Sequence, residues 1–246
     1  MEATRVALVT CGMSELGTAI CRRLDSAGFI VAVSFAPGQR DPQAWLAMQR
    51  DDGYRFHAYQ VDTGDYADTE WMVQKVLAEL GRVDVLVNHV ERFCEHSLRS
   101  MSPDDWHSVL RDNLDSIFNL SKQVLDGMLE RQWGRIINLS SVSAQSGAGG
   151  QSAYAAALAG MHGLSKSLAL EVARHGITVN TVSPGALRSS DNAAPAQPRS
   201  GNVAAIPVGR LGEVAEVAAL IDYLASDIAG FVTGANIAIN GGQHMC

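Results

Sequence analysis

The chain has 246 residues, of which 47% are hydrophobic, and a formal net charge of −7. The acidic balance and the lack of a basic tract exclude nucleic acid and an anionic membrane surface as expected partners. No apolar run reaches the roughly 20 residues that cross a bilayer, and the acidic N-terminus carries no secretion signal. We therefore expect one cytoplasmic domain over residues 1–246, with reduced thiols at Cys11, Cys21, Cys94 and Cys246.

Along the chain, short apolar runs that lack polar alternation alternate with segments of helical hydrophobic periodicity. Such runs are typical of strands covered on both faces of a parallel sheet, and this succession predicts a doubly wound α/β fold with helices on both faces. The right-handed crossover rule gives a seven-stranded Rossmann-type sheet in the order 3-2-1-4-5-6-7. The predicted strands cover residues 6–10, 30–34, 56–60, 83–87, 136–140, 178–182 and 235–239, and the predicted helices lie near 15–27, 42–51, 66–80, 103–131, 152–174 and 213–226.

One segment, Ser189–Gly201, breaks this pattern because it is rich in Pro, Ala and Ser and has few apolar anchors. Its two prolines disfavour a helix. We expect this segment to be a loop that is poorly ordered without ligand.

Two hydroxyl groups define the candidate catalytic site. Ser141 follows the predicted strand at 136–140, and Tyr154 stands thirteen residues later at the start of an Ala-rich helix. With this spacing the chain resembles the short-chain dehydrogenase/reductase family. The resemblance implies hydride transfer between a nicotinamide and a carbonyl, with Ser141 holding the carbonyl oxygen and Tyr154 donating the proton. The family's lysine, four residues after the tyrosine, is Leu158 here.

The resemblance extends to a third catalytic position and to a narrower class. Asn113 matches the family's helix asparagine, which holds a proton-relay water, although a mid-helix asparagine equally kinks or caps a helix locally. Whole phrases resemble the bacterial acetoacetyl-CoA reductases, which implies a 3-oxoacyl thioester substrate, NADP(H) and a homotetramer built on the helices near 103–131 and 152–174. Ala186 and Gly149 stand where the resembled enzymes have aromatic residues against the substrate. The matching phrases are 17–21, 122–128, 133–136, 178–185 and 240–245.

The turn after the first strand is the expected phosphate site. A glycine-rich bend lets backbone N–H groups and a helix N-terminus approach a pyrophosphate, so Gly12, Leu16 and Gly17 are candidate cofactor-binding residues. Cys11 and Glu15 occupy two glycine positions of the family's motif. Cys11 adds a Cβ where the turn needs an unusual φ. Glu15 places a carboxylate beside the expected pyrophosphate, or is a first-turn acid that stabilises the helix N-terminus.

The remaining candidate cofactor-binding residues are Arg40, Asp62, Asn88, Pro184 and Gly185. No acid follows the second strand to receive the ribose of NAD, so Arg40 favours NADP(H), unless it is a surface arginine. Asp62 matches the family's adenine-contacting acid, or caps the next helix. Asn88 keeps the first position of a small-residue turn, and the resemblance implies backbone contacts at Pro184 and Gly185.

A polar stretch after Asn88 contains two histidines, two glutamates and a cysteine within 89–96. The spacings match no zinc or iron site, so we expect a polar loop and no metal.

Two functions from different classes remain. In the first, the chain is an NADP(H)-dependent 3-oxoacyl-thioester reductase whose cofactor binding and catalysis are impaired. In the second, it is a non-catalytic paralogue that acts as a scaffold, a regulator or a partner subunit. The departures at Cys11, Glu15, the turn at 88–91 and Leu158 all fall on the expected cofactor site. This distribution favours the second function, and with it weak or absent cofactor binding.

Overall fold

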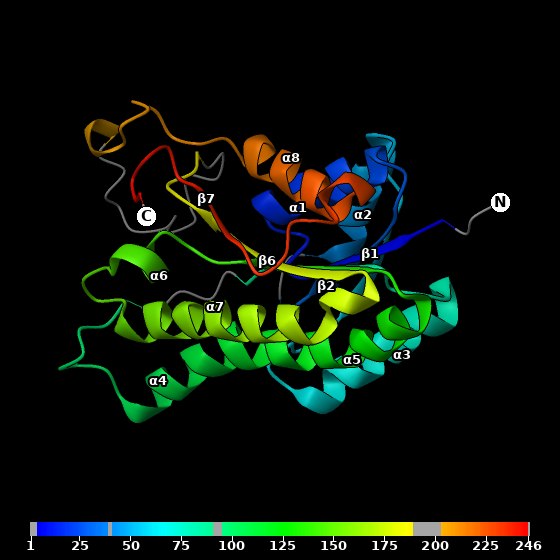
Figure 1. Cartoon of the computed structure of the whole chain (residues 1–246), viewed down its shortest axis with the longest axis horizontal. Helices are drawn as coiled ribbons and strands as arrows, with labels where there is room; N and C mark the ends of the chain where they lie inside the picture. The colour runs from blue at the N-terminus through cyan, green and yellow to red at the C-terminus, as the bar shows by residue number, and fades with distance from the viewer. Residues whose placement is uncertain (1–3, 39–40, 91–94, 189–202, 246) are drawn as a thin grey trace.

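Seven parallel strands form one sheet in the order β3-β2-β1-β4-β5-β6-β7, as predicted. The computed structural model describes residues 4–38, 41–90, 95–188 and 203–245 (Figure 1). The predicted loop at 189–201 therefore lies outside the described residues. The strands are β1 (Val6–Val9), β2 (Ile30–Phe35), β3 (Phe56–Gln60), β4 (Val85–Asn88), β5 (Gly134–Leu139), β6 (Ile177–Pro184) and β7 (Asn236–Ile239).

The strand order reverses between β1 and β4, which is where the candidate site lies. β1 pairs with β2 on one side and with β4 on the other. In a doubly wound sheet, a reversal of this kind leaves a crevice outside the carboxyl ends of the two strands. The segments that follow β1 and β4 therefore meet at this edge.

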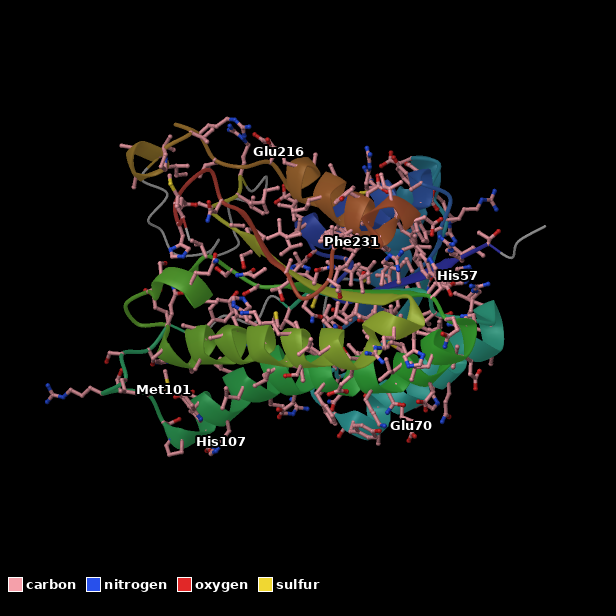
Figure 2. The ribbon with its side chains drawn as sticks, viewed as in Figure 1. His57, Glu70, Met101, His107, Glu216 and Phe231 are labelled. Atoms are coloured by element: carbon pink, nitrogen blue, oxygen red, sulfur yellow. The ribbon has the colours of Figure 1, made fainter. Side chains whose placement is uncertain are left out.

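Helices cover both faces of the sheet (Figure 1). One layer holds α1, α2 and α8, and the other holds α3, α4, α5 and α7. Figure 2 shows side chains filling both spaces, with His107 of α4 and Glu216 of α8 on opposite outer sides. The helices are α1 (Glu15–Ser26), α2 (Pro42–Asp51), α3 (Tyr66–Leu80), α4 (Pro103–Leu110), α5 (Ser116–Arg131), α6 (Ser143–Ser146), α7 (Ser152–Val172) and α8 (Val214–Ala225).

A hydrophobic core lies on each face. Ile20 and Leu24 of α1 and Ile221 and Leu224 of α8 pack on one face, while Met72 of α3 and Leu120 and Met128 of α5 pack on the other. The central strands β1 and β4 are buried along their whole length, which explains their unbroken apolar runs.

The segment predicted as a helix over 103–131 is helical throughout, but its helix type changes in the middle. The chain forms α4, then a π-helical turn at Arg111–Asp115, then α5. Asn113 Nδ2 donates to the carbonyl of Val109 at 2.8 Å, four residues back, and thereby competes with the regular ladder. Asn113 therefore lies inside the π-helical turn, and its role with a proton-relay water stays a prediction.

Short elements outside the predicted set join the main ones. They are α6 and the 3₁₀ turns Ala173–His175, Val203–Ala205 and Asp227–Ala229. Within the described part of the chain, no helix is long and apolar enough to cross a membrane.

Candidate functional site

The turn between β1 and α1 is packed so closely that two glycines are required. A Cβ on Gly12 would lie 2.5 Å from Val33 Cγ1, and one on Gly17 would lie 2.3 Å from the carbonyl oxygen of Cys11. The backbone N–H of Gly12 donates to Ser34 O at 3.2 Å. These contacts fix the turn against β2 and α1, so both glycines have a packing role independent of any ligand.

Ser14, which the sequence analysis did not select, is the N-cap of α1. Its Oγ accepts from the Gly17 N–H at 3.0 Å, and its carbonyl accepts from Thr18 N at 2.8 Å. Serine three residues before a helical N–H is a recognisable cap signal, so the sequence contained this information.

Glu15 and Leu16 begin α1 and face different environments. Glu15 is exposed in the first turn, which confirms the prediction of a first-turn acid. Its carboxylate is stabilised there by the positive end of the helix dipole. Leu16 is buried in the core beneath α1, so a ligand at this turn would meet the backbone of Leu16 and not its side chain.

Cys11 adopts φ 46°, in the left-handed region where a non-glycine residue is strained. The expectation that this position has an unusual φ is confirmed. The turn therefore keeps its glycine-like backbone although the residue is cysteine.

The ends of β1 and β4 are joined by hydrogen bonds through one side chain. Thr10 Oγ1 donates to His89 O at 2.6 Å and accepts from His89 N at 2.7 Å. Asn88 Nδ2 donates to Asn138 Oδ1 at 2.8 Å, and Asn138 Nδ2 donates to Ser165 Oγ at 2.8 Å. Asn88 is 1% exposed, so this amide holds the strand ends together, and its contact with a cofactor remains a prediction.

Asp62 does not cap a helix, because Asp65 is the N-cap of α3. Asp62 instead accepts from Gly64 N at 3.0 Å and forms an ion pair with Arg111 of the π-helical turn. The two residues are 49 positions apart, so this pair gave no signal in the sequence. Arg40 lies outside the described residues, and its proposed role with a 2′-phosphate stays a prediction.

Ser141 lies at the exit of β5 with its hydroxyl oxygen already accepting a hydrogen bond. The N–H of Ser143 donates to Ser141 Oγ at 3.2 Å, and Ser141 is 3% exposed. A hydroxyl that accepts at its oxygen keeps its own proton available for donation. Ser141 therefore has the chemistry to hold a carbonyl oxygen.

Tyr154, near the start of α7, packs beside an apolar cluster made of Ile117, Leu158 and Met161. Leu158 is only 2% exposed. A leucine there can neither donate to a ribose nor place a cation near the tyrosine. Lys166 lies twelve residues beyond Tyr154 on the same helix, about 18 Å along its axis, so it does not replace the missing lysine.

Pro184 and Gly185 lie at the carboxyl end of β6, next to the segment that carries Ser141. Pro184 O accepts from Val142 N at 3.0 Å, next to Ser141. A Cβ on Gly185 would lie 2.2 Å from Gln243 Oε1, which accepts from Ala186 N at 2.8 Å. These contacts hold the strand-exit loop of β6 against the segment after β7.

Gln151 is a second polar residue that the sequence analysis did not select. It precedes α7 and is 1% exposed, and neither its amide oxygen nor its amide nitrogen has a partner among the described residues. A buried amide without partners is costly, so a polar group bound beside Tyr154 would be stabilised there.

The two ends of the candidate site differ in polarity. At the turn between β1 and α1, the N–H groups of Gly12, Ser14 and Gly17 donate to other groups of the protein, so the N-terminus of α1 is the feature that suits a phosphate. Beside Tyr154, the cluster of Ile117, Leu158 and Met161 is apolar. In the described ranges, no group of three or more His, Cys, Asp or Glu side chains has a metal-binding arrangement.

A doubly wound sheet with Ser141 and Tyr154 at its carboxyl edge defines a class, and comparison with known families identifies it. The family model described as short chain dehydrogenase matches residues 5–200, and the chain belongs to that family. It is 44% identical over 242 residues to the acetoacetyl-CoA reductase of Cupriavidus necator, with 98% of each chain covered. It is 41% identical over 241 residues to nodulation protein G of Azospirillum brasilense and 38% identical over 242 residues to the 3-oxoacyl-(acyl-carrier-protein) reductase FabG of Escherichia coli. Coverage in both cases is again 98% of each chain.

Proposed function

We propose that this chain is a 3-oxoacyl-thioester reductase of the acetoacetyl-CoA reductase type in which NADP(H) binding and catalysis are impaired. The family relationship supports the reductase chemistry, and the substrate class rests on the printed names of the two reductase relatives. The observation that carries the impairment is Leu158, which is buried in an apolar cluster at the position of the family's lysine.

In this proposal Ser141 and Tyr154 act on the substrate carbonyl. Ser141 donates its hydroxyl proton to the carbonyl oxygen, and the Tyr154 phenol protonates the alkoxide that forms. A bound reduced nicotinamide would supply the hydride. With a reference pKa of about 10, a tyrosine is protonated at neutral pH and has a proton to give. Without a cation at 158, the developing charge is less well stabilised, and loss of one such group commonly costs on the order of 10²–10³ in rate.

The alternative function is that of a non-catalytic partner subunit. Two large apolar side chains, Phe118 of α5 and Leu170 of α7, are 50% and 85% exposed on the layer of long helices. Exposed apolar residues on adjacent helices favour an interface between subunits. We propose a homo-oligomer, a tetramer by resemblance, built on this layer, and this assembly serves either function.

Titration with NADPH and NADH, followed by nicotinamide fluorescence or calorimetry, tests the proposal. We expect dissociation constants for NADPH of hundreds of micromolar or larger. The Glu15 carboxylate would repel a pyrophosphate, and the Leu158 side chain cannot donate a hydrogen bond to the ribose. Each effect removes roughly one to two kcal/mol, which is about tenfold in affinity. Micromolar affinity, or rapid reduction of acetoacetyl-CoA by the unaltered protein, would overturn the proposal.

Two reversions sharpen this test. Glu15→Gly and Leu158→Lys together should increase NADPH affinity more than either change alone, because both act on one ligand. Matched controls are Glu70→Gly, which removes an exposed acid from α3 (Figure 2), and Ile228→Lys, which adds a lysine at an exposed position of the 3₁₀ turn after α8. Equal gains from the controls would show that net charge alone, and not the site, governs binding.

A further inference from the structure

Ser140, the residue before Ser141, forms a hydrogen bond with His162 of α7. Ser140 Oγ lies 2.8 Å from His162 Nε2. Ser140 is 7% exposed, and His162 is half-buried on α7. Neither residue belongs to the chemistry described above, and 22 positions separate them in the chain.

The segment that carries Ser141 is held to β6 by its backbone on both sides. Ser140 N donates to Val182 O at 2.7 Å, and Val142 N donates to Pro184 O at 3.0 Å. The backbone at Ser141 is therefore fixed relative to β6. Tyr154 belongs to a different element, so its distance from Ser141 depends on how α7 is held against the exit of β5.

Side-chain hydrogen bonds at two places join α7 to β5 and its exit. The first, between Asn138 and Ser165, lies beneath the sheet edge, and both of its residues are at most 2% exposed. The second is the pair of Ser140 and His162, which lies nearer the candidate site. His162 is two helical turns, about 12 Å, beyond Tyr154 and on a similar side of the helix. This pair is thus placed to control the spacing between Tyr154 and Ser141.

We propose that His162 is a positioning residue. Nε2 of its neutral ring accepts a hydrogen bond from the Ser140 hydroxyl, and this bond fixes the distance between Tyr154 and Ser141. The inference rests on the proposed function, because it assigns His162 to the same site. It adds a titratable group to a site whose position 158 has lost one.

The surroundings of His162 favour the neutral ring. Burial lowers the pKa of His162, and the positive charge of Lys166 one turn later lowers it further. The neighbouring elements α6, β6 and β7 contain no titratable side chain. The charged helix α4 and the π-helical turn lie on the other side of α7, where a Cβ on Gly160 would be 3.1 Å from Leu114. A neutral ring has one nitrogen lone pair, which suits it to accept from a hydroxyl.

A histidine titration by NMR tests which group donates. In protein labelled with ¹³C-histidine, we expect Ser140→Ala to shift the titration of His162 upward, because the lost hydrogen bond stabilised the neutral ring. His162→Gln identifies the resonance. An unchanged His162 titration in Ser140→Ala would mean that the ring donates the hydrogen bond or that the contact has no effect on the ring. Either result would overturn the proposal.

A tyrosine signal tests the positioning role. In protein labelled at tyrosine ¹³Cζ, with Tyr154→Phe used for assignment, we expect His162→Leu to move the Tyr154 resonance and His162→Gln to leave it near its original position. The resonance of Tyr59, on β3 far from α7, is the internal control. If His162→Leu leaves the Tyr154 resonance unmoved, the positioning role is wrong. Neither measurement needs bound nicotinamide or turnover, so failure of the proposed function would leave both readouts intact.

Discussion

Replacing Cys11 by glycine should stabilise the protein relative to replacing it by alanine. Cys11 has φ 46°, and in the described residues only Gln132, at φ 53°, shares this feature among non-glycine residues. An L-residue in the left-handed region costs roughly 1–2 kcal/mol, which glycine avoids. Alanine removes the thiol but keeps the Cβ, so the pair of variants isolates the backbone strain.

The expected difference follows from two opposing terms. Glycine gains the full relief of strain, but it also has more freedom in the unfolded chain, which costs about 0.4–1 kcal/mol. Loss of the half-buried thiol is common to both variants and cancels. The net result is that Cys11→Gly should be more stable than Cys11→Ala by about 0.5–1 kcal/mol. At an ordinary helical position the order is reversed by a similar amount.

Thermal unfolding in reducing buffer measures this difference. For a chain of this length, 1 kcal/mol corresponds to about 2–4 °C in Tm. The matched control is Gln74, exposed in the middle of α3, where the alanine variant should be more stable than the glycine variant. If Cys11→Ala melts at or above the temperature of Cys11→Gly, the left-handed strain at this turn is refuted.

Three further predictions concern packing, pH and assembly. Gly17→Ala should destabilise the protein by roughly 1–3 kcal/mol, measured by denaturant unfolding, because its Cβ would lie 2.3 Å from Cys11 O. Arg210 holds the pKa of Glu216 at about 2, first through its side-chain hydrogen bond and then with help from the Glu213 N–H. The stability from this pair is therefore present above the unfolded pKa of about 4.5 and lost as pH falls toward 2, so Arg210→Gln should lower Tm at pH 7 more than at pH 3. Light scattering at micromolar concentration should show an oligomer that Leu170→Lys weakens.

Each of these predictions has a result that would contradict it. Gly163→Ala on α7 meets nothing within 4 Å, so it should be tolerated, and equal damage at both glycines would remove the packing argument. A Tm loss in Arg210→Gln that does not change with pH would show that its ion pair with Glu216 is not the cause. A species of 26 kDa alone would contradict the proposed assembly.

The fold was largely predictable because its signals are local. Apolar runs covered on both faces located every strand to within two residues, and the crossover rule supplied the order. The predicted bounds of α2 and α3 match the structure, and Asp41, Asp65 and Gly81 mark their ends as caps. Asn113 signalled a local irregularity in the helix at 103–131, but the π-helical form of residues 111–115 was not predictable, since hydrophobic periodicity does not record the bond from Asn113 to Val109.

Only the part of the site that lies directly after the parallel strands could be predicted from the sequence. Ser141, Tyr154 and the turn at Gly12–Gly17 lie at the carboxyl edge because parallel strands end there. The pairs Asp62 with Arg111 and Ser140 with His162 depend on how the π-helical turn at Arg111–Asp115 and α7 are rotated against the sheet. Such rotations are set by packing and not by sequence spacing.

The departures from the family motif at Glu15 and Leu158 differ in their effect on the stability of the fold. Glu15 is exposed at a helix end, so we expect its removal to leave the core intact while it tests the proposed effect on cofactor affinity. Leu158 is part of the core beside Ile117 and Met161. A lysine there would bury its ammonium among apolar side chains, which is unfavourable unless a polar ligand covers it. We therefore expect Leu158→Lys to lower the free energy of unfolding in the absence of a ligand, and a bound nucleotide to restore part of that loss if the proposed cofactor site is correct.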